Sequence, residues 1–167
     1  MDIENLVCHF YHWLVIILMK ANEGKEEKDQ RHGGYMCVWE ETGVDPEGQK
    51  EYHLVALNRL GTPPIGKLVK YCEFAQEKVE RLSHRPSHLS SWQSRDTKVD
   101  KWGGAIKAGK FLLSFSGLPE LDDEALCLLV AVDLGLLPLE EARTIALTSN
   151  NVGALPLLGS IETACAR

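Results

Sequence analysis

The chain has 167 residues, a length that suits one domain around a single hydrophobic core. Hydrophobic residues make up 44% of the chain and charged residues 25%, and both fractions are ordinary for a globular protein. The formal net charge is −6, and lysine and arginine form no concentrated block, which argues against a nucleic-acid partner because phosphate binding needs a basic surface.

The first predicted element is a helix from Ile3 to Ala21, where apolar residues recur at steps of three and four. Its apolar run LVCHFYHWLVIILM (6–19) is too short to span a membrane and contains two histidines, so no membrane partner is expected. Asp2 and Glu4 precede the run in place of basic residues, which argues against a signal peptide. Because this helix is apolar on nearly all sides, we expect it to be buried or to face another subunit.

Two strands are predicted next, over YMCVWEE (35–41) and EYHLVALNRL (51–60). The segment TGVDPEGQK between them contains Gly, Pro and Asp, which are typical turn residues, so a hairpin with a long loop is expected. In the second run, alternate side chains point to opposite faces of the strand, and neither set of alternate residues is fully polar. This favours a strand that is covered on both faces.

A second helix is expected after LGTPPIG, in which Pro63 or Pro64 is suited to a helix start. It should end near Ser83 because Pro86 disfavours helical backbone at the residue before it. Charged residues, with Lys78 and Arg81 among them, are expected to cover much of its surface outside an apolar stripe. That stripe consists of Ile65, Leu68, Val69, Cys72, Ala75, Val79 and Leu82.

The polar, serine-rich segment 83–102 shows no sustained period and is interpreted as a long loop, a kind of segment that is often functional in small domains. The residues that follow, GGAIKAGK (103–110), nearly match the phosphate-binding pattern G-x-x-x-x-G-K, but Phe111 replaces the Ser or Thr that would bind magnesium. A true phosphate-binding loop also follows a strand and opens a helix, whereas KFLLSFS reads as a strand. The pattern therefore predicts a β-hairpin that turns at Ala108 and Gly109.

A buried helix is predicted over the apolar run ALCLLVAVDLGLL (125–137). The carboxylates of Asp122, Asp123 and Glu124 precede it, and we interpret them as a helix N-terminus, where the helix dipole favours anions. Another helix should run from Pro138 to near Asn150.

The order of these elements predicts an α/β fold with an antiparallel sheet flanked by helices. Residues 1–150 are taken as one domain and residues 151–167 as a C-terminal tail. The cysteines are odd in number and show no C-x-x-C spacing, which favours buried reduced thiols in a cytoplasmic protein. They are Cys8, Cys37, Cys72, Cys127 and Cys165.

His84 and His88 have the i, i+4 spacing that would place two imidazoles on one face of a helix. Pro86 lies between them and no third ligand is evident nearby, so the spacing does not favour a zinc site. We interpret both as surface loop residues, with a lone axial ligand to a haem as the alternative.

Two stretches resemble the GlcG/HbpS-like family, which includes the C-terminal domain of PduO-type proteins. One is HLVALNRLGTPPIGKLVKYCEFAQEKVERL (53–82). The other is a Gly-Gly entry, a small turn with Gly, an apolar strand ending in Ser-Gly and an acidic helix start, although Ala105 replaces the usual proline. The positions on this second pattern are Gly103, Gly104, Ile106, Gly109, Ser116, Gly117, Asp122, Asp123, Glu124 and Ala125.

This resemblance implies a profilin-like α/β domain that binds a small molecule without catalysis, such as haem, corrinoid or a similar flat cofactor, and works as a homo-oligomer. One alternative is an assembly or protein-interaction module whose first helix contributes the interface. Another is a small hydrolase or lyase, which would need a pocket with a perturbed titratable pair. The residues expected to line a cofactor pocket are His84, His88, Gly103, Gly104, Ser116 and Gly117.

Overall fold

A computed structural model describes residues 2–165 of the chain, with side chains through Glu162. Its helices and strands are α1 (Ile3–Asn22), β1 (Gly33–Val44), β2 (Lys50–Gly61), α2 (Leu68–Ser83), β3 (Ala105–Ala108), β4 (Phe111–Ser116), α3 (Glu120–Asp133), α4 (Leu139–Thr148) and α5 (Leu155–Cys165). Within the described residues the strands form one four-stranded antiparallel sheet in the order β2-β1-β4-β3.

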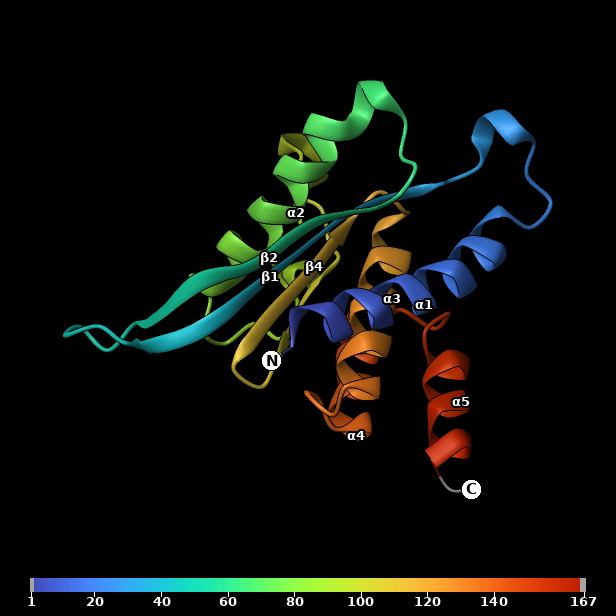
Figure 1. Ribbon diagram of the computed structural model, residues 1–167. Helices are drawn as coiled ribbons and strands as arrows, with labels where there is room; N and C mark the ends of the chain where they lie inside the picture. The colour runs from blue at the N-terminus through green and yellow to red at the C-terminus, as the bar shows by residue number, and fades with distance from the viewer. Residues whose placement is uncertain (1, 166–167) are drawn as a thin grey trace.

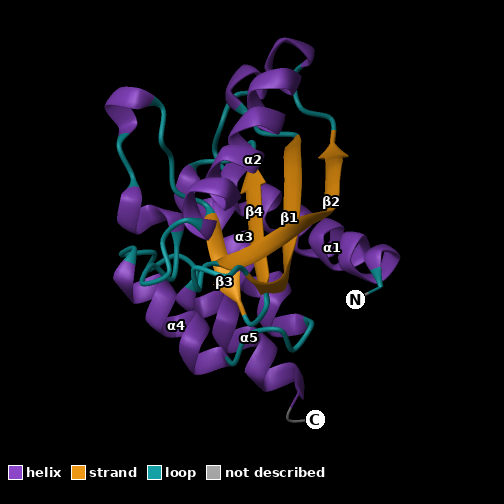
Figure 2. Ribbon diagram, turned by 90° about the vertical axis from the view of Figure 1, so that its left-hand side faces the viewer, coloured by secondary structure: helices purple, strands orange, loops and turns teal. Residues whose placement is uncertain are grey.

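Helices cover both faces of this sheet (Figure 1). Helix α2 packs on one face, and α1 and α3 pack on the other. Helices α4 and α5 contact α3 and each other, and in Figure 2 they lie below the sheet. The structure thus confirms the predicted α/β fold with an antiparallel sheet flanked by helices.

The central strand β4 is buried on both faces. Phe111, Leu113 and Phe115 join the larger hydrophobic core with α1 and α3, because alternate side chains of a strand point to the same face. Leu112 joins the smaller core under α2, and the Ser114 hydroxyl donates a hydrogen bond of 2.6 Å to a backbone carbonyl of α2. Burial on both sides explains why this strand reads as a continuous apolar run.

The near phosphate-binding motif forms the predicted hairpin, but its turn lies one residue later than expected, because Ala108 still belongs to β3. Strands β3 and β4 pair from Ala108 and Phe111 onward, and the two residues between them are Gly109 and Lys110. Gly109 has a φ of +59°, a left-handed conformation that glycine adopts without strain. The backbone here turns from strand to strand, so it does not form the loop before a helix that cradles phosphate.

Helix α2 buries a different set of residues than its apolar stripe predicts. Ile65 is 88% exposed and Val69 is 71% exposed, whereas Lys78 is 1% exposed and Arg81 is 8% exposed. The buried face follows Ala75, Val79 and Leu82 at steps of four and three, and Lys78 and Arg81 lie beside it. Val69 lies on the opposite face, and Ile65 belongs to a separate 3₁₀ turn (Ile65–Lys67) before the helix.

The segment after α2 is ordered by the buried Arg81. It contains two short 3₁₀ helices, Ser91–Ser94 and Thr97–Val99. The Arg81 guanidinium donates hydrogen bonds of 2.8 Å to the Ser91 carbonyl and 2.6 Å to the Trp102 carbonyl, and it also pairs with the Glu77 carboxylate at 2.7 Å. One buried cation therefore fixes the middle and the end of the predicted long loop to α2.

The packed part of the chain extends beyond residue 150. Leu158 and Ile161 of α5 belong to the larger core, so the segment expected as a C-terminal tail supplies a helix of the domain. The Asn151 side chain donates a hydrogen bond of 2.7 Å to the Leu121 carbonyl and so holds the start of this segment against α3.

Glu124 corrects the interpretation of the acidic residues at the start of α3 as a simple helix N-terminus. Its side chain is fully buried, and it accepts hydrogen bonds from Ser90 (2.5 Å), Ser149 and Asn151 (3.3 Å). Burial raises the pKa of this carboxyl above its usual value, and the three donors oppose the shift. Glu124 joins α3 to the loop after α2 and to the end of α4.

Helix α1 is buried along one side, where Leu6, Phe10 and Leu14 enter the larger core. Its opposite side exposes Tyr11, Val15 and Met19. No helix in the described part of the chain is long and apolar enough to cross a membrane.

The prediction of buried thiols is correct for Cys37 and Cys127 and wrong for Cys8, which is exposed on α1. Cys72 is half-buried. The side chain of Cys165 lies outside the described residues.

Candidate functional site

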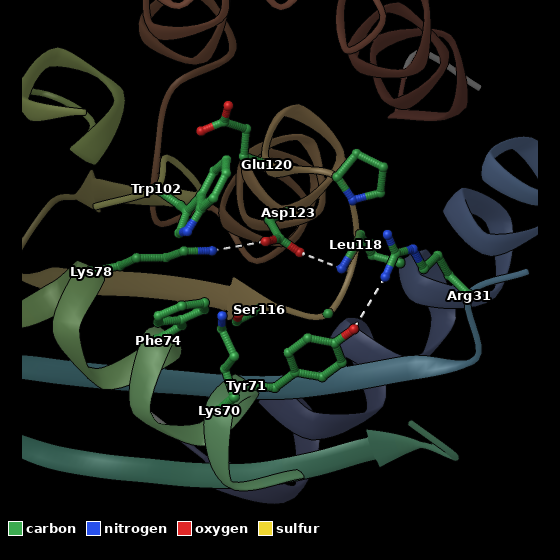
Figure 3. A pocket seen from close by; sticks show the side chains of 12 residues that line it. Arg31, Lys70, Tyr71, Phe74, Lys78, Trp102, Ser116, Leu118, Glu120 and Asp123 are labelled. Atoms are coloured by element: carbon green, nitrogen blue, oxygen red, sulfur yellow. Dashed lines mark hydrogen bonds and ion pairs between the residues drawn. The ribbon is translucent and has the colours of Figure 1, made fainter. Parts of the chain in front are cut away.

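A pocket of about 420 Å³ opens between α2 and the junction of β4 with α3 (Figure 3). We call it the α2–α3 pocket. Its lining combines cations, carboxylates and aromatic rings from segments far apart in the sequence. The lining residues are Arg31, Lys70, Tyr71, Phe74, Lys78, Trp102, Ser116, Gly117, Leu118, Pro119, Glu120 and Asp123.

The floor of this pocket is a buried ion pair between Lys78 of α2 and Asp123 of α3. Lys78 Nζ donates to Asp123 Oδ2 and to the Phe115 carbonyl oxygen, each at 2.8 Å. Asp123 Oδ1 accepts a hydrogen bond of 3.0 Å from the Leu118 backbone N–H. Figure 3 shows Lys78 reaching across the pocket to Asp123, and both side chains are almost completely buried.

Two glycines with positive φ lie at the pocket floor, and one of them, Gly104, makes room for this pair. Gly104 has a φ of +109°, and a Cβ there would lie 2.7 Å from Asp123 Cβ and 2.9 Å from Lys78 Nζ. Gly117 follows the last residue of β4 and has a φ of +152°. A Cβ there would lie 2.3 Å from the carbonyl oxygen of Gly33 in the neighbouring strand β1. A larger residue would strain the backbone and collide at either position, so the Gly-Gly entry and the Ser-Gly exit shape the pocket floor.

The surroundings of the Asp123 carboxyl raise its pKa above the usual value. Burial raises its pKa from 3.8 to about 6, and the neighbouring Lys78 ammonium and Leu118 N–H hold it from rising further. The site thus contains one carboxyl with a perturbed pKa, in direct contact with a buried amine.

Three aromatic side chains form the walls. Tyr71 and Phe74 come from α2, and Trp102 comes from the end of the loop that Arg81 holds in place. Arg31 donates a hydrogen bond of 3.1 Å to the Tyr71 hydroxyl, and Lys70 Nζ lies 4.9 Å from the centre of the Phe74 ring. The walls therefore present flat apolar faces bordered by two cations.

The carboxylates of the pocket are already paired within the protein. Glu120 binds Arg95 at 2.7 Å and the Gly103 N–H at 2.8 Å, and Asp123 binds Lys78. Among residues 2–165, by contrast, no carboxylate lies within ion-pair distance of Lys70 or Arg31. The charge that the pocket offers to a ligand is therefore positive.

The residues predicted from sequence to form one pocket are split between two places. Ser116 and Gly117 line the α2–α3 pocket, and Gly103 and Gly104 lie against its Glu120 and Asp123 side chains. His84 lines a second pocket of about 500 Å³ at the opposite end of the β3–β4 hairpin. Neither His84 nor His88 is among the described residues that line the α2–α3 pocket with Ser116 and Gly117.

The reason for the split lies in the direction of α2. The helix runs from the α2–α3 pocket, which Lys70 lines, to the second pocket, which Ser83 and His84 line. His88 lies in the turn beyond, where its Nδ1 is buried with no hydrogen-bond partner among the described residues. Burial and the nearby Arg85 and Lys107 cations lower the pKa of His88.

No group of three or more His, Cys, Asp or Glu side chains in the described part of the chain could hold a metal ion. Sequence reasoning missed most of the pocket walls, namely Arg31, Lys70, Tyr71, Phe74 and Trp102, and it placed Lys78 in solvent. The one local signal for Lys78 is its position next to Val79, between Ala75 and Leu82 on the face of α2 that packs.

Comparisons with protein-family models, with curated proteins and with solved structures found no match for this chain. The resemblance to the GlcG/HbpS-like family stays a prediction from the residues named above.

Proposed function

We propose that the chain is a non-catalytic binding module for a small, flat, anionic molecule, which it holds in the α2–α3 pocket. The observation that carries the proposal is the combination of three aromatic walls with two cations that have no carboxylate partner among the described residues. Aromatic faces stack on planar ligands, and a guanidinium or ammonium group binds a carboxylate or phosphate through charge-assisted hydrogen bonds.

Haem and corrinoids are candidates of this class, because both have a large planar ring and haem carries two carboxylates. Arg31 and Lys70 are suited to those carboxylates, and Tyr71, Phe74 and Trp102 to the ring. None of the described residues that line the α2–α3 pocket is a histidine, so we assign His84 and His88 no axial role there. The binding energy would come from stacking and charge.

Calorimetric titration with naphthoate, a planar monoanion, tests the proposal without assuming a physiological ligand. We expect saturable binding at one site, weaker binding of the uncharged naphthamide, and loss of affinity in the Lys70→Gln variant. Lys98→Gln removes an exposed lysine of the loop that does not line the pocket, and it should bind as the wild type does. Equal affinity for naphthoate and naphthamide would contradict the assigned role of charge.

An absorbance titration with haemin extends this test to the larger ligand. We expect a shift of the Soret band that Lys70→Gln weakens and that His84→Ala leaves unchanged. A shift lost only in His84→Ala would instead assign haem to the second pocket.

A second candidate function is assembly through α1. Tyr11, Val15 and Met19 recur every four residues on its exposed side, and the acidic Glu4 and basic Lys20 at its two ends suit antiparallel pairing with a second copy. Sedimentation analysis would show a dimer that Val15→Glu dissociates, whereas Val44→Glu, at another exposed valine, would leave it intact. A wild-type monomer at every concentration would contradict this candidate.

A further inference from the structure

The amine of Lys78 has a hydrogen-bonding position left for a ligand. An ammonium group has three N–H donors, and Lys78 uses two of them, on the Phe115 carbonyl and on Asp123. For the third, the described residues provide no acceptor, and Lys78 lines the α2–α3 pocket. A polar group of a bound molecule can therefore meet Nζ directly.

Asp123 is placed to exchange a proton with this amine. Its Oδ2 lies 2.8 Å from Lys78 Nζ, and both groups are almost completely buried. Proton transfer from the ammonium to the carboxylate would leave two neutral groups, which a buried site accommodates at a lower desolvation cost than two charges. The raised pKa of Asp123, about 6 because of its burial, acts in the same direction. An unprotonated lysine amine is a nucleophile toward carbonyl carbon.

The surroundings also favour a carbonyl compound of a particular shape. Phe74 and Trp102 line the pocket near the end of Lys78, and Arg31 and Lys70 border it (Figure 3). The aromatic pair would hold a flat carbonyl group in contact with Nζ, while a cation binds an acidic group elsewhere on the same molecule.

From this arrangement we propose that Lys78 forms an imine with an aldehyde or ketone group of a flat, anionic molecule, and that Asp123 carries the proton. The inference rests on the proposed function, because the same aromatic walls and cations position the molecule. It adds a covalent step that the binding proposal does not contain.

The step balances without an oxidant or reductant. Asp123 takes one proton from the Lys78 ammonium, the amine lone pair forms the C–N bond, and the carbonyl π electrons move to oxygen. A second proton passes from nitrogen to that oxygen to give a hydroxyl. Asp123 then protonates the hydroxyl, the C–O bond breaks, and water leaves as the nitrogen lone pair completes the C=N bond. The sum converts ammonium and carbonyl into protonated imine and water.

Reductive trapping tests this proposal on the full chain. The protein is incubated with para-formylbenzoate, a flat aldehyde with one carboxylate, together with cyanoborohydride, and peptide mass spectrometry locates the reduced adduct. We expect labelling of Lys78 to be at least about tenfold faster than labelling of exposed lysines such as Lys98, because the pocket orients the reactants. Naphthoate should protect Lys78 and leave the labelling of Lys98 unchanged.

The Asp123→Asn variant tests the proton carrier, since Asn has nearly the same shape and cannot exchange a proton. We expect it to label Lys78 about a hundredfold more slowly, the usual size of general acid–base assistance. Labelling at the wild-type rate in a folded variant would remove Asp123 from the step. If this variant does not fold, the location of the adduct and the protection by naphthoate decide the question in the wild type.

The outcomes separate this inference from the proposed function. Naphthoate could bind while the aldehyde label is spread over the exposed lysines. That result would overturn the imine proposal and leave the binding module intact. Failure of naphthoate to bind the wild type would contradict the binding module itself. Rapid labelling of Lys78 without protection by naphthoate would show a reactive lysine that does not use the proposed ligand site, and would also overturn the inference.

Discussion

Replacing Lys78 with methionine would leave the Asp123 carboxylate buried without its cation. The variant loses the 2.8 Å contact with Asp123 Oδ2 and the 2.8 Å hydrogen bond to the Phe115 carbonyl. Breaking a buried ion pair by removing one partner costs about 3–5 kcal/mol, so we expect the free energy of unfolding of Lys78→Met to fall by that amount at about pH 8.

The loss of unfolding free energy in Lys78→Met should depend on pH. A carboxyl whose folded-state pKa is raised stabilises the fold below its unfolded pKa, and this contribution is lost as the pH rises through the folded pKa. For the wild type that loss falls between 3.8 and about 6. Without Lys78 to oppose burial, the Asp123 pKa rises further, so the variant keeps losing stability above that range. Near pH 5 the deficit should be only about 1–3 kcal/mol, from the unpaired Phe115 carbonyl.

Urea unfolding followed by tryptophan fluorescence at the two pH values measures this difference. Lys70→Met is the matched control, because it removes an exposed lysine of the same pocket and should change stability by no more than about 0.5 kcal/mol. A Lys78→Met deficit that is equal at both pH values, or no larger than that of Lys70→Met, would show that Lys78 does not compensate the buried Asp123 charge.

Three further changes test the structure around the pocket. Gly104→Ala should lower the melting temperature well below that of Gly135→Ala, because both glycines have positive φ but only the Cβ at 104 would meet other atoms. Arg81→Met should speed amide hydrogen exchange in residues 91–102 and leave exchange in the sheet unchanged. Exchange in residues 91–102 at the wild-type rate would argue against anchoring of this loop by Arg81. Glu124→Gln should cost about 1–3 kcal/mol in urea unfolding, because an amide NH₂ cannot accept all three hydrogen bonds that the carboxylate accepts.

Much of the fold follows from local patterns in the sequence. The three- and four-residue steps of α1 and the apolar run of α3 predict both helices. The β3–β4 hairpin is predicted from Gly109 and from the strand-like residues that follow it. These elements are predictable because their signal lies within a few residues of the chain.

The site depended on contacts between distant residues. Lys78 is a typical surface residue by type, and its burial requires Asp123 and the Phe115 carbonyl, which come from other elements. The spacing of His84 and His88 suggested a ligand site, but both residues follow the end of α2, away from the glycine turns. The cluster of Asp123 and Glu124 was readable as an acidic helix start, but only the packed structure shows that both carboxylates are buried.

Calorimetry with naphthoate on the wild type and on a variant that carries both Arg31→Gln and Lys70→Gln measures what the two pocket cations contribute to anion binding. We expect one saturable site in the wild type. We also expect at least about a tenfold loss of affinity in the variant, because a hydrogen bond to a charged group contributes about 1.5–3 kcal/mol. Absence of binding in the wild type, or an unchanged affinity in the variant, would contradict the assignment of the α2–α3 pocket as a site for flat anions.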